Sequence, residues 1–383
     1  MRSEDRDRRR PNQGDRVTYW RPRVIIREIT LSLAANTWRA WALFAVAVGL
    51  ILAVSSTEQI QVERALAAEH AQALAGKYTY RIGAVPTDAT GETPGLHAGR
   101  CVALGSRDHV LAAAGFTLTD PVTLARAPGQ QAELAVGVGP VAALWSGEKE
   151  RRGAPSASLL VPVDMADAIG LAAGQGLVVD GRAYPTTDTF RPGPRIPEAA
   201  AWLIATGPPS GAVTQCWVEF PAAAADAGAA ALRAWFDRNG GQVTVSAVFV
   251  ADDLTIDPTV AYETRATREG WLVVGLVLGG ILAIVGWFKR PEIALYRTLG
   301  SGPIQTAAIF SAQGTVLYSG AWLVSVLLLG LRALVASPRP PIDALVLGAR
   351  AGLLTALVGM VAQVIAFVAL SSGATVRQIK DRA

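Results

Sequence analysis

The sequence predicts a membrane protein with four transmembrane α-helices plus an α+β extracytoplasmic domain on a helical stalk. Hydrophobic residues make up 51% of the chain and charged residues only 17%, which is typical of a chain that lies partly in lipid. Four runs supply the roughly 20 mostly apolar residues that a membrane-spanning helix needs. A mixed pattern of helices and strands separates the first run from the second.

The predicted segments follow one another in a simple order. They are a basic cytoplasmic tail with an interfacial helix (1–39), the first transmembrane helix (40–56), the extracytoplasmic α+β domain with stalk helices (57–268), the second transmembrane helix (269–288), a cytoplasmic loop (289–305), the third transmembrane helix (306–332), a short outer loop (333–344), the fourth transmembrane helix (345–370) and a cytoplasmic tail (371–383).

Arginine indicates the orientation. Ten arginines precede Trp41, so the positive-inside rule puts the N-terminus in the cytoplasm, and four spans return the C-terminus to that side. The first run also has the length of a signal-peptide core, but residues 1–39 before it and three later spans favour an uncleaved anchor. The basic tail also contains acidic residues and has no interleaved aromatic residues. Both features argue against nucleic-acid binding. We therefore expect a multi-pass protein of the plasma (inner) membrane.

The extracytoplasmic segment begins and ends with predicted helices. Residues 57–75 contain no proline or glycine, and they predict a helix that continues the first span and ends at Gly76. Residues 259–268 predict the matching stalk helix, and two unrelated surface helices are the alternative. The strands expected between them are 78–84, 101–104, 133–138, 158–163, 176–180, 182–187, 201–206, 215–220 and 243–250. Asp180-Gly181 predicts a hairpin turn, and 164–169 and 221–239 predict helices.

No catalytic motif is found in the sequence. Gly300 to Pro303 is a glycine turn, but it lacks the Lys-Ser/Thr pair of a Walker A motif, so we expect no ATP hydrolysis by this chain. His97 and His109 flank Cys101, which leaves a Cys/His site as one alternative and solvated surface histidines as the other. Cys101 and Cys216 are predicted in strands of one extracytoplasmic domain, where either a disulfide or two buried free cysteines would fit.

Small residues recur at helical spacing in two of the spans. Gly275 and Gly279 form one GxxxG pair, and Gly348 and Gly352 form another. Such pairs let helix backbones approach closely, so these four glycines are candidate helix-packing positions.

The loop after the second span carries the most informative stretch. Residues 290–300 read RPEIALYRTLG and continue as SGPIQ. This resembles the signature of the FtsX/MacB-like permease family, roughly R-x-x-E-I-A-L-L-R-A-L-G-A-S-x-x-Q-I. Residues 165–184 (MADAIGLAAGQGLVVDGRAY) are similar to the helix-then-hairpin element of MacB-type periplasmic domains. Gln313 departs from the family, which often has a glutamate early in the third span.

The resemblance implies the permease subunit of an ABC-type complex, which transmits ATP-driven motion of a separate ATPase subunit to the extracytoplasmic domain for export or extraction of a substrate. The alternatives are an FtsX-like regulator of a cell-wall hydrolase, a peptide sensor, or a membrane-anchored interaction domain without an ATPase. Other implied partners are a second permease copy, the lipid bilayer, and an extracytoplasmic adaptor or substrate. This chain would bind no cofactor, because ATP and magnesium belong to the partner subunit.

The same loop is the expected docking element. An amphipathic helix can seat closely spaced anchors in a groove of a soluble partner. A helix that only lies on lipid is the alternative. The residues expected to dock the ATPase are Glu292, Ile293, Leu295, Tyr296, Arg297, Leu299 and Gly300.

Overall fold

The structure is a computed structural model that describes residues 37–85, 95–146, 158–237, 242–249, 257–336 and 341–373. Most of the predicted basic tail (1–36) and of the C-terminal tail (374–383) lies outside the described residues, as does Asn239 at the end of a predicted helix. The chain divides into a helical unit (Met1–Ala65 with Val260–Ala383) and a sheet unit (Leu66–Thr259).

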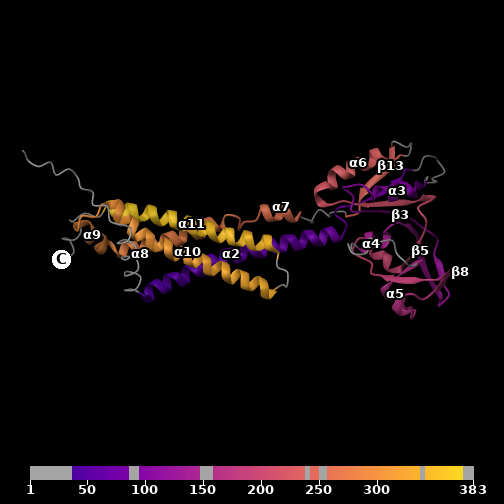
Figure 1. Cartoon of the computed structure of the whole chain (residues 1–383), viewed down its shortest axis with the longest axis horizontal. Coiled ribbons are helices and arrows are strands. Elements are labelled where there is room, and N and C mark those ends of the chain that lie inside the picture. Colours follow the sequence, from indigo (N-terminus) through magenta and orange to yellow (C-terminus); the bar gives the residue numbers. More distant parts are fainter. Residues whose placement is uncertain are drawn as a thin grey trace, which may run out of the picture. The chain divides into compact units, whose positions relative to one another are not determined.

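The helical unit is built from long apolar helices. Four helices, α2, α8, α10 and α11, have the length and composition of membrane spans. Figure 1 shows them side by side. The helices of this unit are α2 (Thr37–Leu74), α7 (Pro258–Glu263), α8 (Gly270–Phe288), α9 (Arg290–Thr298), α10 (Pro303–Ala336) and α11 (Ile342–Gly373). Helix α2 is continuous from the first span through the predicted stalk, as the sequence predicts, and the chain turns at Gly76 with φ +97°.

Both GxxxG pairs lie at close helix contacts within the chain. A Cβ on Gly275 would lie 2.7 Å from Val358 of α11, and one on Gly279 would lie 2.5 Å from Ala362. Gly348 and Gly352 bring α11 against α2, where a Cβ on Gly348 would lie 2.8 Å from the Ser55 carbonyl oxygen. The four glycines therefore hold α8 and α2 against α11.

The second stalk helix is shorter than predicted. Helix α7 covers only Pro258–Glu263, and the chain then passes through turns to α8. The Arg265 guanidinium donates a hydrogen bond to the Tyr262 carbonyl oxygen, which supplies this carbonyl with a side-chain donor near the end of the helix. The prediction of a helix through residue 268 is therefore wrong, since α7 ends at Glu263.

The sheet unit contains an 11-stranded mixed sheet in its described residues. Eight strands follow the order β13-β1-β12-β3-β5-β10-β6-β9, and β4, β7 and β8 extend from β5. The pairs β5–β10 and β6–β9 are parallel, and the other pairs are antiparallel. The strands are β1 (Thr79–Ala84), β3 (Ala112–Leu118), β4 (Val122–Leu124), β5 (Ala127–Val138), β6 (Leu159–Pro162), β7 (Leu177–Val179), β8 (Arg182–Tyr184), β9 (Thr187–Phe190), β10 (Trp202–Thr206), β12 (Gln215–Glu219) and β13 (Val243–Ala247), with β2 (Leu96–His97) and β11 (Ala212–Val213) pairing separately.

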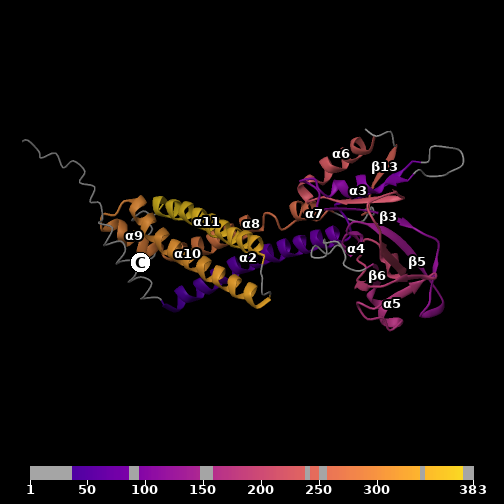
Figure 2. The same cartoon turned by 45° about the vertical axis from the view of Figure 1, so that its right-hand side comes forward.

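Helices cover the two faces of this sheet. Helices α3 (Ala98–Leu104) and α6 (Ala225–Asp237) pack on one face over Cys216 and Val218. Figure 2 shows both of them beside β13. Helix α4 (Val141–Ser146) packs on the other face, where Trp145 meets Trp217 and Phe116. Helix α5 (Val163–Ala168) and the short 3-10 helices Pro197–Ala201 and Ala222–Ala224 complete the unit.

Two predictions for the sheet unit are wrong. Residues 101–104 belong to helix α3 and not to a strand, because Ala98, Cys101 and Leu104 are spaced to bury one helical face. The central strand β3 is absent from the predicted strands, since AAAGFTL is rich in alanine and glycine, which are poor strand formers. Its position between β12 and β5 makes it a strand despite this composition.

The Asp180-Gly181 hairpin is confirmed. Strands β7 and β8 pair antiparallel with Val179 opposite Arg182, and both turn residues have positive φ, +48° and +75°. A two-residue turn with two positive φ values is the type I′ turn that Asp-Gly favours.

Candidate functional site

Helix α9 is fixed to the end of the helical unit by its buried face. Ile293 and Ala294 are buried, and Ile293 packs with Ala307 and Phe310 of α10 and with Phe367 of α11. The Tyr296 ring lies edge-on to Phe310 at 6.0 Å between centroids. Ile293 is 1% exposed, so it is not available to a partner, contrary to the prediction.

An arginine ties the same helix to the end of α11. Arg297 Nη1 donates a hydrogen bond of 2.9 Å to the Ser371 carbonyl oxygen. This carbonyl belongs to the last turn of α11, where backbone acceptors lack helical donors and a cation is favourable. Arg297 thus makes a contact inside the chain, and its docking role stays a prediction.

Glycine and glutamine of the motif shape the turn from α9 into α10. Gly300 has φ +93°, and its N–H donates to the Arg297 carbonyl while the Ser301 N–H donates to the Tyr296 carbonyl. This is the Schellman pattern that ends a helix at glycine. The Gly302 N–H then donates to Gln305 Oε1 at 3.2 Å, which caps the start of α10. Gly300 and Gln305 of the motif therefore have a structural role in the turn between α9 and α10.

One face of α9 is exposed and carries an acidic residue and two leucines of the motif. Glu292, Leu295 and Leu299 are exposed, and their 3- and 4-residue spacing places them on one face, opposite Ile293 and Ala294. Leu295 is 58% and Leu299 71% exposed. Gly300 is exposed as well, and Tyr296 and Arg297 are half-buried. We call the acidic residue and the apolar pair on this face the α9 patch (Glu292, Leu295 and Leu299), and docking of an ATPase there stays a prediction.

A second polar cluster joins α2 to the segment before α8. Both carboxylate oxygens of Glu58 accept hydrogen bonds from Arg265 Nη2, at 2.6 and 2.8 Å, and Tyr262 Oη donates to Glu58 at 2.5 Å. The guanidinium carbon lies 3.7 Å from the centroid of the Tyr262 ring. The side chains of Arg265 and Glu58 are only 12% and 16% exposed, so this pair is screened little by solvent. The two stalk segments are thereby joined.

A buried arginine binds the C-terminal end of α2 inside the sheet unit. Arg195 Nε donates to the Leu74 carbonyl at 3.1 Å, and Nη2 donates to the Ala73 carbonyl at 3.2 Å. The same guanidinium donates to the Leu144 carbonyl at 2.7 Å and to Glu219 of β12 at 3.0 Å. Arg195 therefore connects the last turn of α2 to the central sheet.

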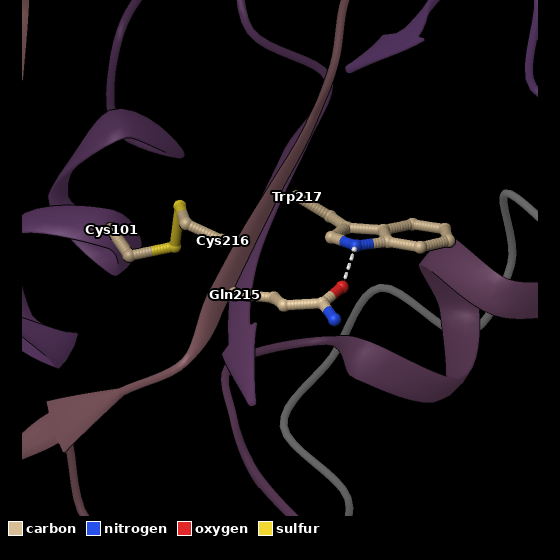
Figure 3. The surroundings of a disulfide bond; sticks show 4 residues. All are labelled: Cys101, Gln215, Cys216 and Trp217. Atoms are coloured by element: carbon tan, nitrogen blue, oxygen red, sulfur yellow. Dashed lines mark hydrogen bonds between the residues drawn. A yellow bond between two sulfur atoms is a disulfide. The ribbon is translucent and has the colours of Figure 1, made fainter. Parts of the chain in front are cut away.

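The disulfide lies on the opposite side of β12 from the tryptophan core. Cys101 of α3 and Cys216 of β12 are joined, with 5.8 Å between Cα atoms, which excludes free cysteines and a Cys/His site at Cys101. Figure 3 shows Cys216 on one side of the strand, with Gln215 and Trp217 on the other, where Trp217 Nε1 donates to Gln215 Oε1 at 3.2 Å. In the described part of the chain, no group of three His, Cys, Asp or Glu side chains forms a metal site.

Sequence reasoning missed Arg195, Glu58 and Arg265. Arg195 lies in a segment rich in proline and glycine, so its pattern indicates only a loop, and its partners are distant along the chain. Gln363 was missed too, although an amide inside an apolar span is a signal that sequence alone provides.

Comparisons with known proteins give similarity in structure only. No protein-family model matches the chain, and no curated protein matches it. The periplasmic region of MacB from Actinobacillus actinomycetemcomitans is similar over 45% of this chain and 90% of its own, with 9% identity and a TM-score of 0.32. A domain of a protein described as a permease, from Porphyromonas gingivalis, is similar over 49% of this chain and 97% of its own, with 15% identity and a TM-score of 0.32.

Proposed function

We propose that the chain is the permease subunit of an ABC-type complex and that a separate ATPase subunit docks on the α9 patch. The observation that carries the proposal is the division of the family-like motif into an anchored side and a free side. Ile293 and Arg297 hold α9 to α10 and α11, while Leu295 and Leu299 are left in solvent. An apolar pair at i, i+4 beside a carboxylate is the kind of anchor set that a groove receives.

Contacts within each unit support a mechanical role. Arg297 joins α9 to α11, and Gly348 and Gly352 bring α11 against α2. Helix α2 runs unbroken to Leu74, a length of about 57 Å at ~1.5 Å per residue, and Arg195 binds its last carbonyls. We propose that displacement of α9 by the ATPase reaches the sheet domain along this route. The same proposal places α9 and both termini in the cytoplasm and the sheet domain outside it.

The test uses the full-length chain purified in mild detergent from membranes of its source cell. We expect a subunit with a Walker A motif to accompany the wild type and to hydrolyse MgATP. The variant Leu295→Asp/Leu299→Asp would place carboxylates in an apolar groove, which costs several kcal/mol when they are unpaired. It should lose the ATPase subunit and its activity.

A matched control carries the same kind of change elsewhere. Val178 of β7 is an apolar side chain that is 40% exposed in the sheet domain, so Val178→Asp should leave the ATPase bound. Both variants must insert in the membrane and keep the Cys101–Cys216 bond. Equal ATPase content in the α9 variant and the wild type would remove the α9 patch as the docking element. Absence of any ATPase from the wild-type complex would refute the permease assignment itself.

A further inference from the structure

A cavity lies among the helices of the helical unit at the end where α9 packs. Its volume is about 560 Å³, and α2, α8, α9, α10 and α11 all contribute to its walls. This size falls within the range of ~300–1,000 Å³ that is usual for small-molecule sites. Most of the wall is apolar, with Leu43, Leu282, Leu317, Phe310 and Phe367 among the lining residues.

Two glutamines add polar groups to this apolar wall. Gln313 and Gln363 both line the cavity. Gln363 is 2% exposed, and its Nε2 donates a hydrogen bond of 3.3 Å to the Phe310 carbonyl oxygen. A side chain on Gly314 would collide with the Gln363 amide, so the glycine leaves room for it. Polar groups within membrane-spanning helices are costly and usually have a function.

Charged residues surround the same cavity, and the cations outnumber the carboxylates. Arg39 and Lys289 line it together with a single carboxylate, Glu292. The Arg39 guanidinium lies 5.7 Å from the centroid of the Trp38 ring, and Trp38 is 71% exposed. An exposed tryptophan beside an arginine at the end of an apolar helix is typical of the headgroup layer of a bilayer. The charged part of the cavity therefore lies at the depth of lipid headgroups, and the apolar part lies among acyl chains.

We infer that this cavity binds one phospholipid with an anionic headgroup. The phosphate pairs with Arg39 and Lys289, the amide of Gln313 serves the ester region, and an acyl chain lies along Leu43 and Leu282. Arginine and lysine bind phosphate by charge-assisted hydrogen bonds, and a zwitterionic lipid offers no net negative charge to them. The inference rests on membrane insertion of the four helices, and Glu292 is the residue that this cavity shares with the α9 patch.

A second copy of the chain fits the cavity less well than a lipid does. Helix pairs in membranes associate through small residues that permit close approach, and both GxxxG pairs already serve contacts inside the chain. The cavity is a hollow with two cations, not a flat surface of small residues. Charge and shape together favour an amphiphile.

The test is a lipid titration of the full-length chain in a neutral detergent, read by native mass spectrometry. Phosphatidylglycerol and phosphatidylcholine with identical acyl chains are compared, and inorganic phosphate is tested as a competitor. We expect one phosphatidylglycerol per chain, bound about tenfold or more tightly than phosphatidylcholine, and no competition by phosphate at the same concentration.

Two variants distinguish the contribution of the cations to lipid binding from that of the cavity's shape. Arg39→Gln/Lys289→Gln should reduce the preference for phosphatidylglycerol by about tenfold, because the charge-assisted contacts are lost. Gln313→Phe should lower binding of both lipids by filling the cavity. Arg350→Gln, which removes an exposed cation of α11 outside the cavity, should change neither.

Four outcomes would overturn the inference. These are equal binding of the two lipids by the wild type, an unchanged preference in Arg39→Gln/Lys289→Gln, displacement of the lipid by inorganic phosphate, and a wild-type chain that takes up no lipid.

Discussion

Replacing Arg195 by methionine should destabilise the sheet domain strongly. The Arg195 side chain is 2% exposed, and its partner Glu219 is 12% exposed. Methionine keeps an unbranched apolar stem but removes the guanidinium. The Glu219 carboxylate then loses its cation in a buried setting, and the carbonyls of Ala73, Leu74 and Leu144 lose a donor.

The expected loss of stability follows from the cost of removing one partner of a buried ion pair. Removing one partner of such a pair typically costs ~3–5 kcal/mol, because the remaining charge stays buried. Removing both charges with Arg195→Met/Glu219→Leu should cost less than the single change, since no carboxylate is then left buried without its cation, while the three carbonyls lose the same donor in both variants, at ~1–3 kcal/mol each. The double variant should therefore be more stable than Arg195→Met.

Urea unfolding of the full-length chain in mild detergent measures this difference. The buried Trp145 and Trp217 report the sheet core by their fluorescence. The membrane helices keep their backbone hydrogen bonds inside the detergent phase and resist urea. A loss of less than about 0.5 kcal/mol in Arg195→Met, the size of an ordinary surface change, would refute the reasoning. So would a double variant that is no more stable than the single one.

Two further predictions concern the sheet unit. The Cys101–Cys216 bond joins two residues that are 115 apart in sequence and so closes a long loop. In the chain-entropy model, Cys101→Ala/Cys216→Ala should lower the free energy of unfolding by up to about 4–5 kcal/mol. A loss below about 1 kcal/mol in the same urea assay would contradict that model here. Burial, followed by its hydrogen bond to Glu69, raises the pKa of Tyr78 from 10.0 to about 12. Because the folded pKa is the higher one, this contribution to stability is complete below about pH 10 and is lost as the pH rises towards 12. Ultraviolet titration should show a tyrosinate step near pH 12 that is missing in Tyr78→Phe. If the variant instead loses a step near pH 10, the pKa of Tyr78 is not raised.

Local sequence patterns were sufficient for much of the architecture. Apolar runs indicate the four long helices, and the lack of proline and glycine through residue 75 indicates that α2 continues beyond the first span. The pair Asp180-Gly181 predicts a type I′ turn, because few residues other than Gly, Asn and Asp readily adopt two successive positive φ values. Periodicity, length and turn chemistry are properties of neighbouring residues, and so they can be read from the sequence.

Tertiary structure decided what depends on distant partners. The sequence of the α9 loop indicates an amphipathic helix, but only packing against α10 and α11 shows that Ile293 faces inward and Leu295 and Leu299 face outward. The alanine-rich segment 112–118 becomes a central strand because β12 and β5 pair with it on both sides. Arg195 sits in a segment without regular pattern, and its role arises from acceptors about 50 to 120 residues away in the chain. Local propensity carries no information about such contacts, because their free energy is gained only when the folded chain brings the groups together.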